Sequence, residues 1–255
     1  MINTDYTSST VDGKGIATLT LTNAKAMNII GTPAILELTE ALAGLRARGD
    51  VRVLVLRGSG DKAFIGGADI YEMSTLTAPE AVAFITRLKN LCEAVRSFPT
   101  PTIARLSGWT LGGGLEVALA CDLRVSSSEA HYGMPEVAVG IPSVIHAVLL
   151  PRLIGTSRAT WMLMTGETIN AATALQWGLV HELCDPIALD IRIAELARKL
   201  AGFGPAALRQ QKSLMRSWES LTPDAAIEAT VPEFGRAFES GEPQRYMELF
   251  KRRRR

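Results

Sequence analysis

Two glutamates and a run of glycines in the middle of the chain have the residue types that proton transfer beside a developing negative charge requires. Glu116 follows the three glycines of residues 112–114 closely, and Glu136 comes twenty residues later. A glycine turn that enters a helix leaves backbone N–H groups unpaired at the positive end of the helix dipole. Such donors suit an oxygen that gains negative charge during a reaction, and two carboxyl groups with different pKa values can divide the acid and base roles. The spacing therefore predicts a catalytic site here.

These residues and a second stretch carry a resemblance to a known family. The sequence GGGLE at residues 112–116, with the Pro135-Glu136 step, resembles the GGGxE…PE spacing of hydratases in the crotonase superfamily, the enoyl-CoA hydratases and isomerases. The upstream sequence AFIGGADI at residues 63–70 resembles the AFxxGADI segment of the same enzymes. The resemblance runs from about Gly15 to Ala201 and continues more weakly through the C-terminal helices. Two matched segments at family spacing are more specific than one glycine cluster.

The resemblance implies a role for each of four residues. The N–H groups of Ala68 and Gly113 would form an oxyanion hole for a thioester enolate. Glu136 would deliver a proton to C2 of an enoyl thioester, and Glu116 would hold and deprotonate the water that attacks C3. Taken singly, the glycines also fit a tight turn, Glu116 a first-turn helix residue and Glu136 a solvated loop carboxylate. The presence of both segments and both glutamates favours the catalytic interpretation.

The resemblance also implies where the coenzyme A part of a substrate binds. The segments around residues 25–27 and 66–70 match the family's site for the adenine end of coenzyme A. A lone surface lysine is usually solvated, so Lys25 meets a phosphate only in the functional interpretation, and Asp69 would order its loop rather than react. No metal and no redox cofactor is implied, because coenzyme A is part of the substrate. The expected substrate-binding residues are Lys25, Ala26, Met27, Gly66, Gly67, Asp69, Ile70 and His146.

His146 belongs to a segment that departs from the hydratase pattern. Hydratases usually carry a small, glycine-rich segment after PExxxG, whereas this chain reads IPSVIH at residues 141–146. Bulk at this place would reshape the acyl pocket and favour short or unusually shaped acyl groups. His146 would bring an imidazole near the substrate, although a histidine merely packed on a helix fits the sequence equally well.

The reaction that these residues favour is hydration of a trans-2-enoyl-CoA thioester. The departure at residues 141–146 keeps open another acyl-CoA reaction on the crotonase fold, such as isomerisation, hydrolysis or decarboxylation. An RNA-binding crotonase-like protein is a third interpretation, supported only by the basic run at residues 251–255. The formal net charge of +1 and the intact glutamate pair argue against nucleic-acid binding.

Alternating strands and helices are expected to hold these residues in place. The apolar patterns and caps predict strands at 15–21, 51–56, 103–106 and 122–126, with a loop at 58–67. They predict helices from 32 to about 48, from about 78 to 98, and at 115–120, 171–177, 191–200, 205–218 and 223–240. Thr77 and Glu80 form a capping box for the second of these helices, Asn170 is the N-cap of the helix at 171–177, and Pro232 is expected to kink or break the last. This order predicts an α/β fold, and the resemblance specifies a crotonase-like spiral of ββα units with a C-terminal helical trimerisation region. The expected units are residues 1–195, the core with the active site, and 196–255, the oligomerisation region.

Composition sets the remaining expectations. The chain has 255 residues, 47% of them hydrophobic, which favours an oligomer, and the resemblance implies a homotrimer or a dimer of trimers. Three cysteines without CxxC spacing favour reduced thiols in a cytoplasmic protein. No secretory signal or transmembrane run is expected, and therefore no membrane partner.

Overall fold

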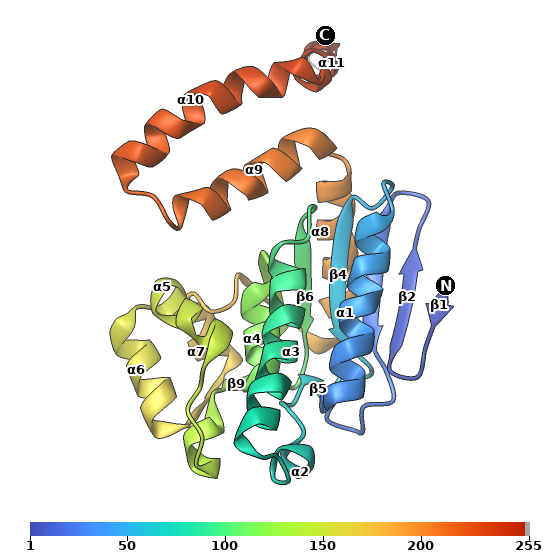
Figure 1. Ribbon diagram of the computed structural model, residues 1–255. Helices are drawn as coiled ribbons and strands as arrows, with labels where there is room; N and C mark the ends of the chain where they lie inside the picture. The colour runs from blue at the N-terminus through green and yellow to red at the C-terminus, as the bar shows by residue number, and fades with distance from the viewer. Residues whose placement is uncertain (253–255) are drawn as a thin grey trace.

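The protein is built on two sheets in the computed structural model, which describes residues 1–252 (Figure 1). The larger sheet has seven strands in the order β1, β2, β3, β4, β6, β8 and β11. The first three strands pair antiparallel and the later neighbours pair parallel. Its strands are β1 (Ile2–Asn3), β2 (Thr7–Val11), β3 (Ile16–Leu21), β4 (Val53–Gly58), β6 (Thr102–Leu106), β8 (Leu123–Ser127) and β11 (Glu182–Cys184).

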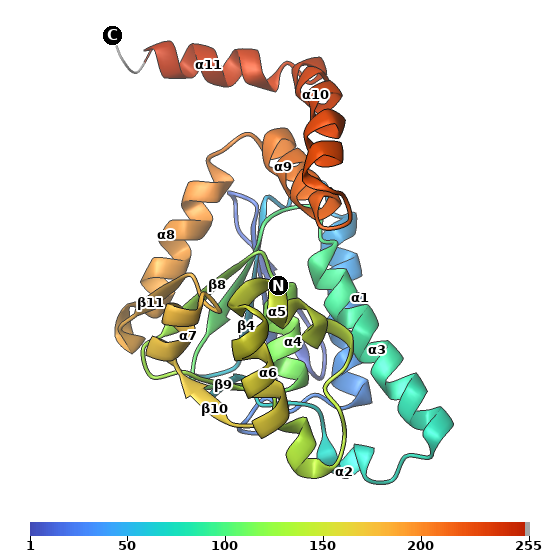
Figure 2. The same cartoon turned by 90° about the vertical axis from the view of Figure 1, so that its left-hand side faces the viewer.

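Both faces of the larger sheet are covered, which explains the continuous apolar run in β4. Leu54 and Leu56 join the main core beneath helices α1 (Thr32–Ala47) and α3 (Ala78–Arg96). Val53 and Val55 point to the other face and pack with the apolar side of α8 (Leu189–Ala201). Figure 2 shows α8 on one side of the sheet and α1 and α3 on the other. A strand buried on both faces has no polar face to alternate with.

The smaller sheet is the part of the fold that holds the candidate site. It has the strand order β10, β9, β7 and β5, in which β5, β7 and β9 are parallel and β10 is antiparallel. Each strand has only three residues: β5 (Ala63–Ile65), β7 (Trp109–Leu111), β9 (His131–Gly133) and β10 (Thr168–Asn170). The expectation of a loop at 58–67 is wrong for this reason, since Gly58 ends β4 and β5 follows within the segment.

Two helices begin where the sequence places their caps. The Thr77 N–H donates to Glu80 Oε2 at 2.8 Å, which closes the predicted capping box of α3. Asn170 accepts the Thr173 N–H at 2.9 Å as the N-cap of α7. The remaining helices are α2 (Ile70–Met73), α4 (Gly113–Ala120), η1 (Pro135–Val139), η2 (Ile145–Leu149), α5 (Leu150–Ile154), α6 (Thr156–Thr165), α7 (Ala171–Trp177), η3 (Pro186–Ala188), α9 (Pro205–Trp218), α10 (Pro223–Glu239) and α11 (Glu242–Arg252).

The last helices extend away from the body, as Figures 1 and 2 both show. A largely buried ion pair holds α9 to the body, because Lys212 Nζ lies 2.7 Å from Asp122 Oδ2. Of the kink or break expected at Pro232, the break is wrong, because α10 continues through this residue. The expected boundary between residues 195 and 196 falls within α8, and the division into two units stays a prediction. The basic run begins at the end of α11, and residues 253–255 lie outside the described part of the chain.

Candidate active site

The candidate residues gather because they follow neighbouring parallel strands of the smaller sheet. Ala68 is the third residue after β5, Gly113 the second after β7, and Glu136 the third after β9. The carboxyl ends of parallel strands lie at one edge of a sheet, where open α/β sheets bind their ligands. Glu116 joins this group from the first turn of α4. A cavity of about 500 Å³ at this edge is lined by all four residues.

Two of the residues that line this cavity, Ala68 and Gly113, have backbone N–H groups without a protein acceptor in the described part of the chain. Ile30 and Ala68 form an isolated parallel β-bridge, in which both hydrogen bonds are made by Ile30. The Ile30 N–H donates to the Gly67 carbonyl, and the Ile30 carbonyl accepts the Asp69 N–H, each at 3.0 Å. The Ala68 N–H therefore takes no part in the hydrogen bonds of this bridge. Gly113 is the first residue of α4, where an N–H has no partner within the helix. Within residues 1–252, neither N–H donates to a backbone or side-chain acceptor, so each is free to donate to a ligand.

Glu116 is a buried carboxyl group that accepts a backbone hydrogen bond. Its exposed fraction is 3%, and its Oε1 accepts the Ala147 N–H at 2.9 Å. Burial raises the pKa of Glu116 to about 8, and the nearby Glu136 raises it further in the same direction, while the Ala147 N–H opposes the shift. Near neutral pH the empty cavity therefore favours a protonated Glu116.

Glu136 lies against the glycine turn on the other side of the cavity. A Cβ built on Gly112 would come within 2.5 Å of Glu136 Oε1, and Gly112 has φ +51°, so the turn admits no side chain here. Ser143 Oγ donates to Glu136 Oε2 at 2.9 Å. Burial raises the pKa of Glu136, although the Ser143 hydrogen bond acts against the shift. Both carboxyl groups thus have raised pKa values and face one cavity.

The raised pKa of Glu116 predicts a pH-dependent stability. A carboxyl group whose pKa is higher in the folded state stabilises the fold fully below its unfolded value, ordinarily 4.5, and loses that contribution as pH rises through the folded value, about 8. The free energy of unfolding should therefore fall, relative to Glu116→Gln, from about pH 5 to about pH 8 and then level off. Urea unfolding of both proteins across this range measures the difference. A difference that stays constant with pH would contradict the assignment.

Apolar side chains form most of the remaining cavity wall. Residues from the end of α2 and the first half of α3 face residues from η1 and the segment that follows it. Val144 lies in this wall, as the bulk of the 141–146 segment predicted. The apolar and backbone lining consists of Gly66, Gly67, Ile70, Met73, Leu76, Ala81, Val82, Phe84, Ile85, Leu88, Leu111, Gly112, Pro135, Ala138, Val139, Ile141, Pro142 and Val144.

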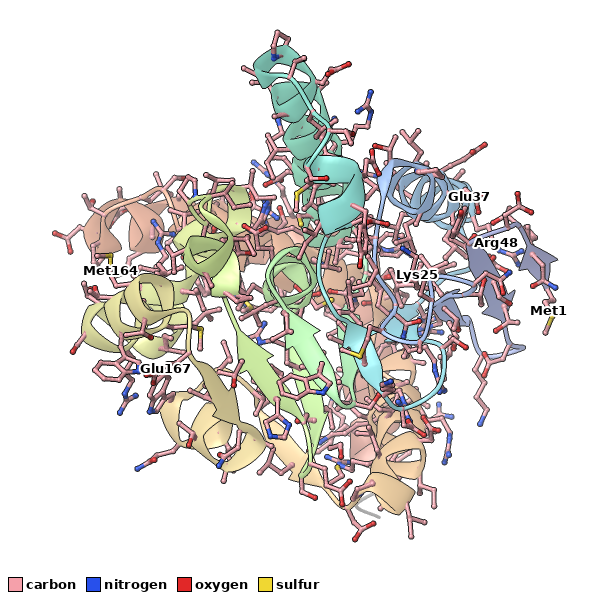
Figure 3. The ribbon with its side chains drawn as sticks, turned by 90° about the horizontal axis from the view of Figure 1, so that it is seen from below. Met1, Lys25, Glu37, Arg48, Met164 and Glu167 are labelled. Atoms are coloured by element: carbon pink, nitrogen blue, oxygen red, sulfur yellow. The ribbon has the colours of Figure 1, made fainter. Side chains whose placement is uncertain are left out.

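The residues expected to receive coenzyme A form a loop beside the cavity. Lys25 Nζ lies 3.2 Å from Asp69 Oδ2 and 5.4 Å from the centre of the Tyr71 ring. Asp69 accepts the Tyr71 N–H at 2.9 Å and caps α2, which is the loop-ordering role expected of it. The Gly66 N–H donates to the Met27 carbonyl at 2.8 Å, which joins residues 25–27 to the segment after β5. Figure 3 shows Lys25 when the molecule is seen from below.

His146 lies outside the cavity, so the structure does not support its expected contact with substrate. Its side chain is buried against α3, where Nε2 lies 2.9 Å from Glu93 Oε1 at an angle poor for a hydrogen bond. Ile145 has φ +38°, and the chain turns there so that the imidazole packs toward α3. The packed histidine is the alternative that the sequence held open. The next residue, Ala147, contributes its N–H to the Glu116 carboxyl group, and no side-chain pattern indicates this donor.

Among residues 1–252, no three His, Cys, Asp or Glu side chains gather as ligands for a metal ion. No helix in that range is long and apolar enough to cross a bilayer. The three cysteines are free.

The two-sheet topology, with backbone donors and carboxyl groups at one sheet edge, is that of a crotonase-type α/β protein. The family model described as enoyl-CoA hydratase/isomerase matches residues 12–255, and the chain belongs to this family. It is 33% identical to the crotonyl-CoA hydratase of Syntrophomonas wolfei and 30% identical to the short-chain-enoyl-CoA hydratase of Clostridium acetobutylicum; each comparison covers 94% of this chain and 92% of the relative. The crystal structure of an enoyl-CoA hydratase from Bacillus anthracis superimposes with a TM-score of 0.93 at 27% identity, covering 97% of this chain and 96% of that one.

Proposed function

We propose that this protein is an enoyl-CoA hydratase that adds water across the double bond of a trans-2-enoyl-CoA thioester. One observation carries the proposal: two backbone N–H groups without a protein acceptor, the buried carboxyl group of Glu116 and the half-buried carboxyl group of Glu136 belong to residues that line the same cavity. The relatives named as crotonyl-CoA and short-chain-enoyl-CoA hydratases support it over nearly the whole chain.

The backbone donors account for activation of the thioester. When water attacks C3, electron density moves through the conjugated system onto the thioester oxygen. The Ala68 and Gly113 N–H groups would donate to that oxygen as its charge grows. Donors fixed by the fold need no rearrangement during the reaction, so they stabilise the enolate more than solvent does.

The carboxyl pair accounts for the two proton transfers. Two interacting carboxyl groups with raised pKa values hold one proton between them near neutral pH. In hydration, the protonated member gives this proton to C2, the water oxygen bonds to C3, and the other member takes a proton from that water. The pair thus ends the addition with one proton, on the opposite carboxyl group.

The structure bears on which carboxyl group begins with the proton. The resemblance implies Glu136 as the acid, whereas the pKa of about 8 favours Glu116 as the protonated member in the empty cavity. Because the groups are coupled, their protons belong to the pair. We therefore assign the acid–base work to Glu116 and Glu136 together. If Glu136 is the acid, as the resemblance implies, a proton passes from Glu116 to Glu136 before water adds.

The proposal extends to the substrate and the assembly. The loop of Lys25 and Asp69 would receive the coenzyme A portion, and the apolar cavity wall with Val144 would favour short acyl groups. No resident metal or cofactor and no nucleic-acid partner is part of the proposal, and we retain the cytoplasmic location. A homotrimer or dimer of trimers would cover apolar side chains that α10 exposes, which are Ile227, Val231, Phe234 and Phe238.

Incubation with crotonyl-CoA tests the function. We expect the ultraviolet absorbance of the conjugated thioester to fall, with a product heavier by one water and still bound to coenzyme A. Release of a free coenzyme A thiol would indicate hydrolysis, and a product of unchanged mass would indicate isomerisation. Either result, or no turnover of any short enoyl-CoA, would contradict hydration.

A further inference from the structure

The η2 turn (Ile145–Leu149) contacts two helices through adjacent residues. On one side the Ala147 N–H donates to Glu116 Oε1 on α4 at 2.9 Å. On the other side His146 Nε2 lies 2.9 Å from Glu93 Oε1 on α3. His146 and Ala147 are each only 4% exposed. One turn of backbone therefore connects the cavity carboxyl group to an acidic residue outside the cavity.

The backbone at the start of this turn is in an unfavourable conformation. Ile145 has φ +38°, in the left-handed region that β-branched residues rarely adopt. Such a conformation persists only where surrounding contacts hold it. The η2 turn packs against α3, α4 and α5, and the approach of His146 to Glu93 is the polar contact of its ring. Loss of that contact would free the turn to relax.

The charged groups around His146 come from three helices. Glu93 and Arg96 face it from α3 and Arg216 from α9, while Glu116 on α4 lies beyond the backbone of η2. Burial lowers the pKa of His146, Glu93 opposes this shift, and the two arginines reinforce it. The ring is thus neutral near pH 7, and we assign its proton to Nε2, which faces the Glu93 carboxylate. In the described part of the chain neither ring nitrogen makes a well-aligned hydrogen bond, so the contact of Nε2 with Glu93 is a close polar approach at 2.9 Å.

We propose that His146 is a positioning residue: its contact with Glu93 holds the η2 turn so that the Ala147 N–H stays directed at the Glu116 carboxyl group. The His146 side chain does not line the cavity, so its role would be exerted through the backbone of η2. This inference rests on the proposed function for its kinetic consequence, because Glu116 belongs to the proposed acid–base pair. The effect on the pKa of Glu116 does not depend on the reaction. The Ala147 N–H stabilises the ionised carboxyl group, so weakening this hydrogen bond should raise the pKa of Glu116.

The test compares His146→Leu with His146→Gln, which keeps an N–H donor near the position of Nε2. The carboxyl carbon resonance of Glu116, identified by its absence in Glu116→Gln, is followed by NMR as pH rises. We expect its midpoint to move upward by about one pH unit in His146→Leu and to return toward the original value in His146→Gln. With crotonyl-CoA, kcat should fall roughly tenfold in His146→Leu, with KM changed less than about twofold and the alkaline limb of the pH profile displaced upward.

Two further variants keep the test decisive. Glu93→Ala removes the other side of the contact and should also move the Glu116 midpoint upward. It replaces His146→Leu in the test if that variant does not fold. His131→Gln, at a half-buried histidine stacked on Trp109, should leave the midpoint and kcat unchanged. An unchanged midpoint in folded His146→Leu, or equal losses in the Leu and Gln variants, would overturn the positioning role. Failure of the wild type to hydrate crotonyl-CoA would refute the proposed function, while the NMR midpoint still decides the inference.

Discussion

Glu116→Gln and Glu136→Gln are each expected to lower kcat for enoyl-CoA hydration by roughly two or more orders of magnitude. An amide keeps the shape and the hydrogen-bond acceptor of each carboxyl group but can neither give nor take the proton. The double variant should lose little more than the worse single variant, because residues that act as one unit are not additive. Initial rates with crotonyl-CoA at several pH values measure all three losses.

A matched control is Glu129→Gln, since Glu129 is exposed and does not line the cavity. It should retain the wild-type kcat, so that loss of a negative charge alone is excluded as the cause. Circular dichroism and unfolding curves check that each variant is folded. Near-normal turnover by either folded cavity variant would refute the assignment of the carboxyl pair.

Removal of the Gly113 N–H is expected to cost as much as removal of a carboxyl group. Proline lacks the N–H and is tolerated at the first residue of a helix, which is the place of Gly113 in α4. Loss of one oxyanion donor lowers kcat by roughly 10²–10³. Gly113→Pro should therefore lose this factor in kcat, with a smaller change in KM. Single-turnover rates with crotonyl-CoA separate the chemical step from binding.

Gly113→Ala provides the comparison, because it keeps the N–H. In either substitution the added Cβ would meet Leu88 Cδ2 at 2.8 Å, the end of a flexible side chain that can shift. The two variants thus share the crowding and differ in the donor. Equal kcat values for folded Gly113→Pro and Gly113→Ala would show that the thioester oxygen does not use this N–H.

The sequence predicted those parts of the fold that have long periods or well-defined caps. The Thr77–Glu80 capping box and the Asn170 N-cap indicated the starts of α3 and α7. The smaller sheet was missed because its strands have three residues each, too short for an alternating pattern to show. The break that Pro232 was expected to cause, as an alternative to a kink, does not occur. The helix α10 loses one backbone hydrogen bond at this residue and stays helical on both sides of it.

The candidate site was predicted by residue type, while its construction was not. Ala68, Gly113, Glu116 and Glu136 do line one cavity, although their roles remain proposals. The direction of the His146 side chain could not be predicted, because it depends on the backbone angle at Ile145, and the sequence gives no sign of a left-handed β-branched residue. The Ala147 N–H was missed for a related reason, since every residue but proline carries such a donor.

At the edge of the smaller sheet the proposed donors are backbone groups and the proposed acid and base are side chains. This difference has a consequence for how such a protein diverges in evolution. The two proposed oxyanion donors belong to the main chain, so most substitutions at residue 68 would leave its donor in place as long as the strand ends where it does. The carboxyl groups at 116 and 136 are side chains, and a single codon change removes either one. Under the proposed function, thioester activation would therefore be the part of the chemistry that substitutions change least. Replacement of Glu136, the third residue after β9, would change what happens to the enolate and leave the proposed backbone donors in place.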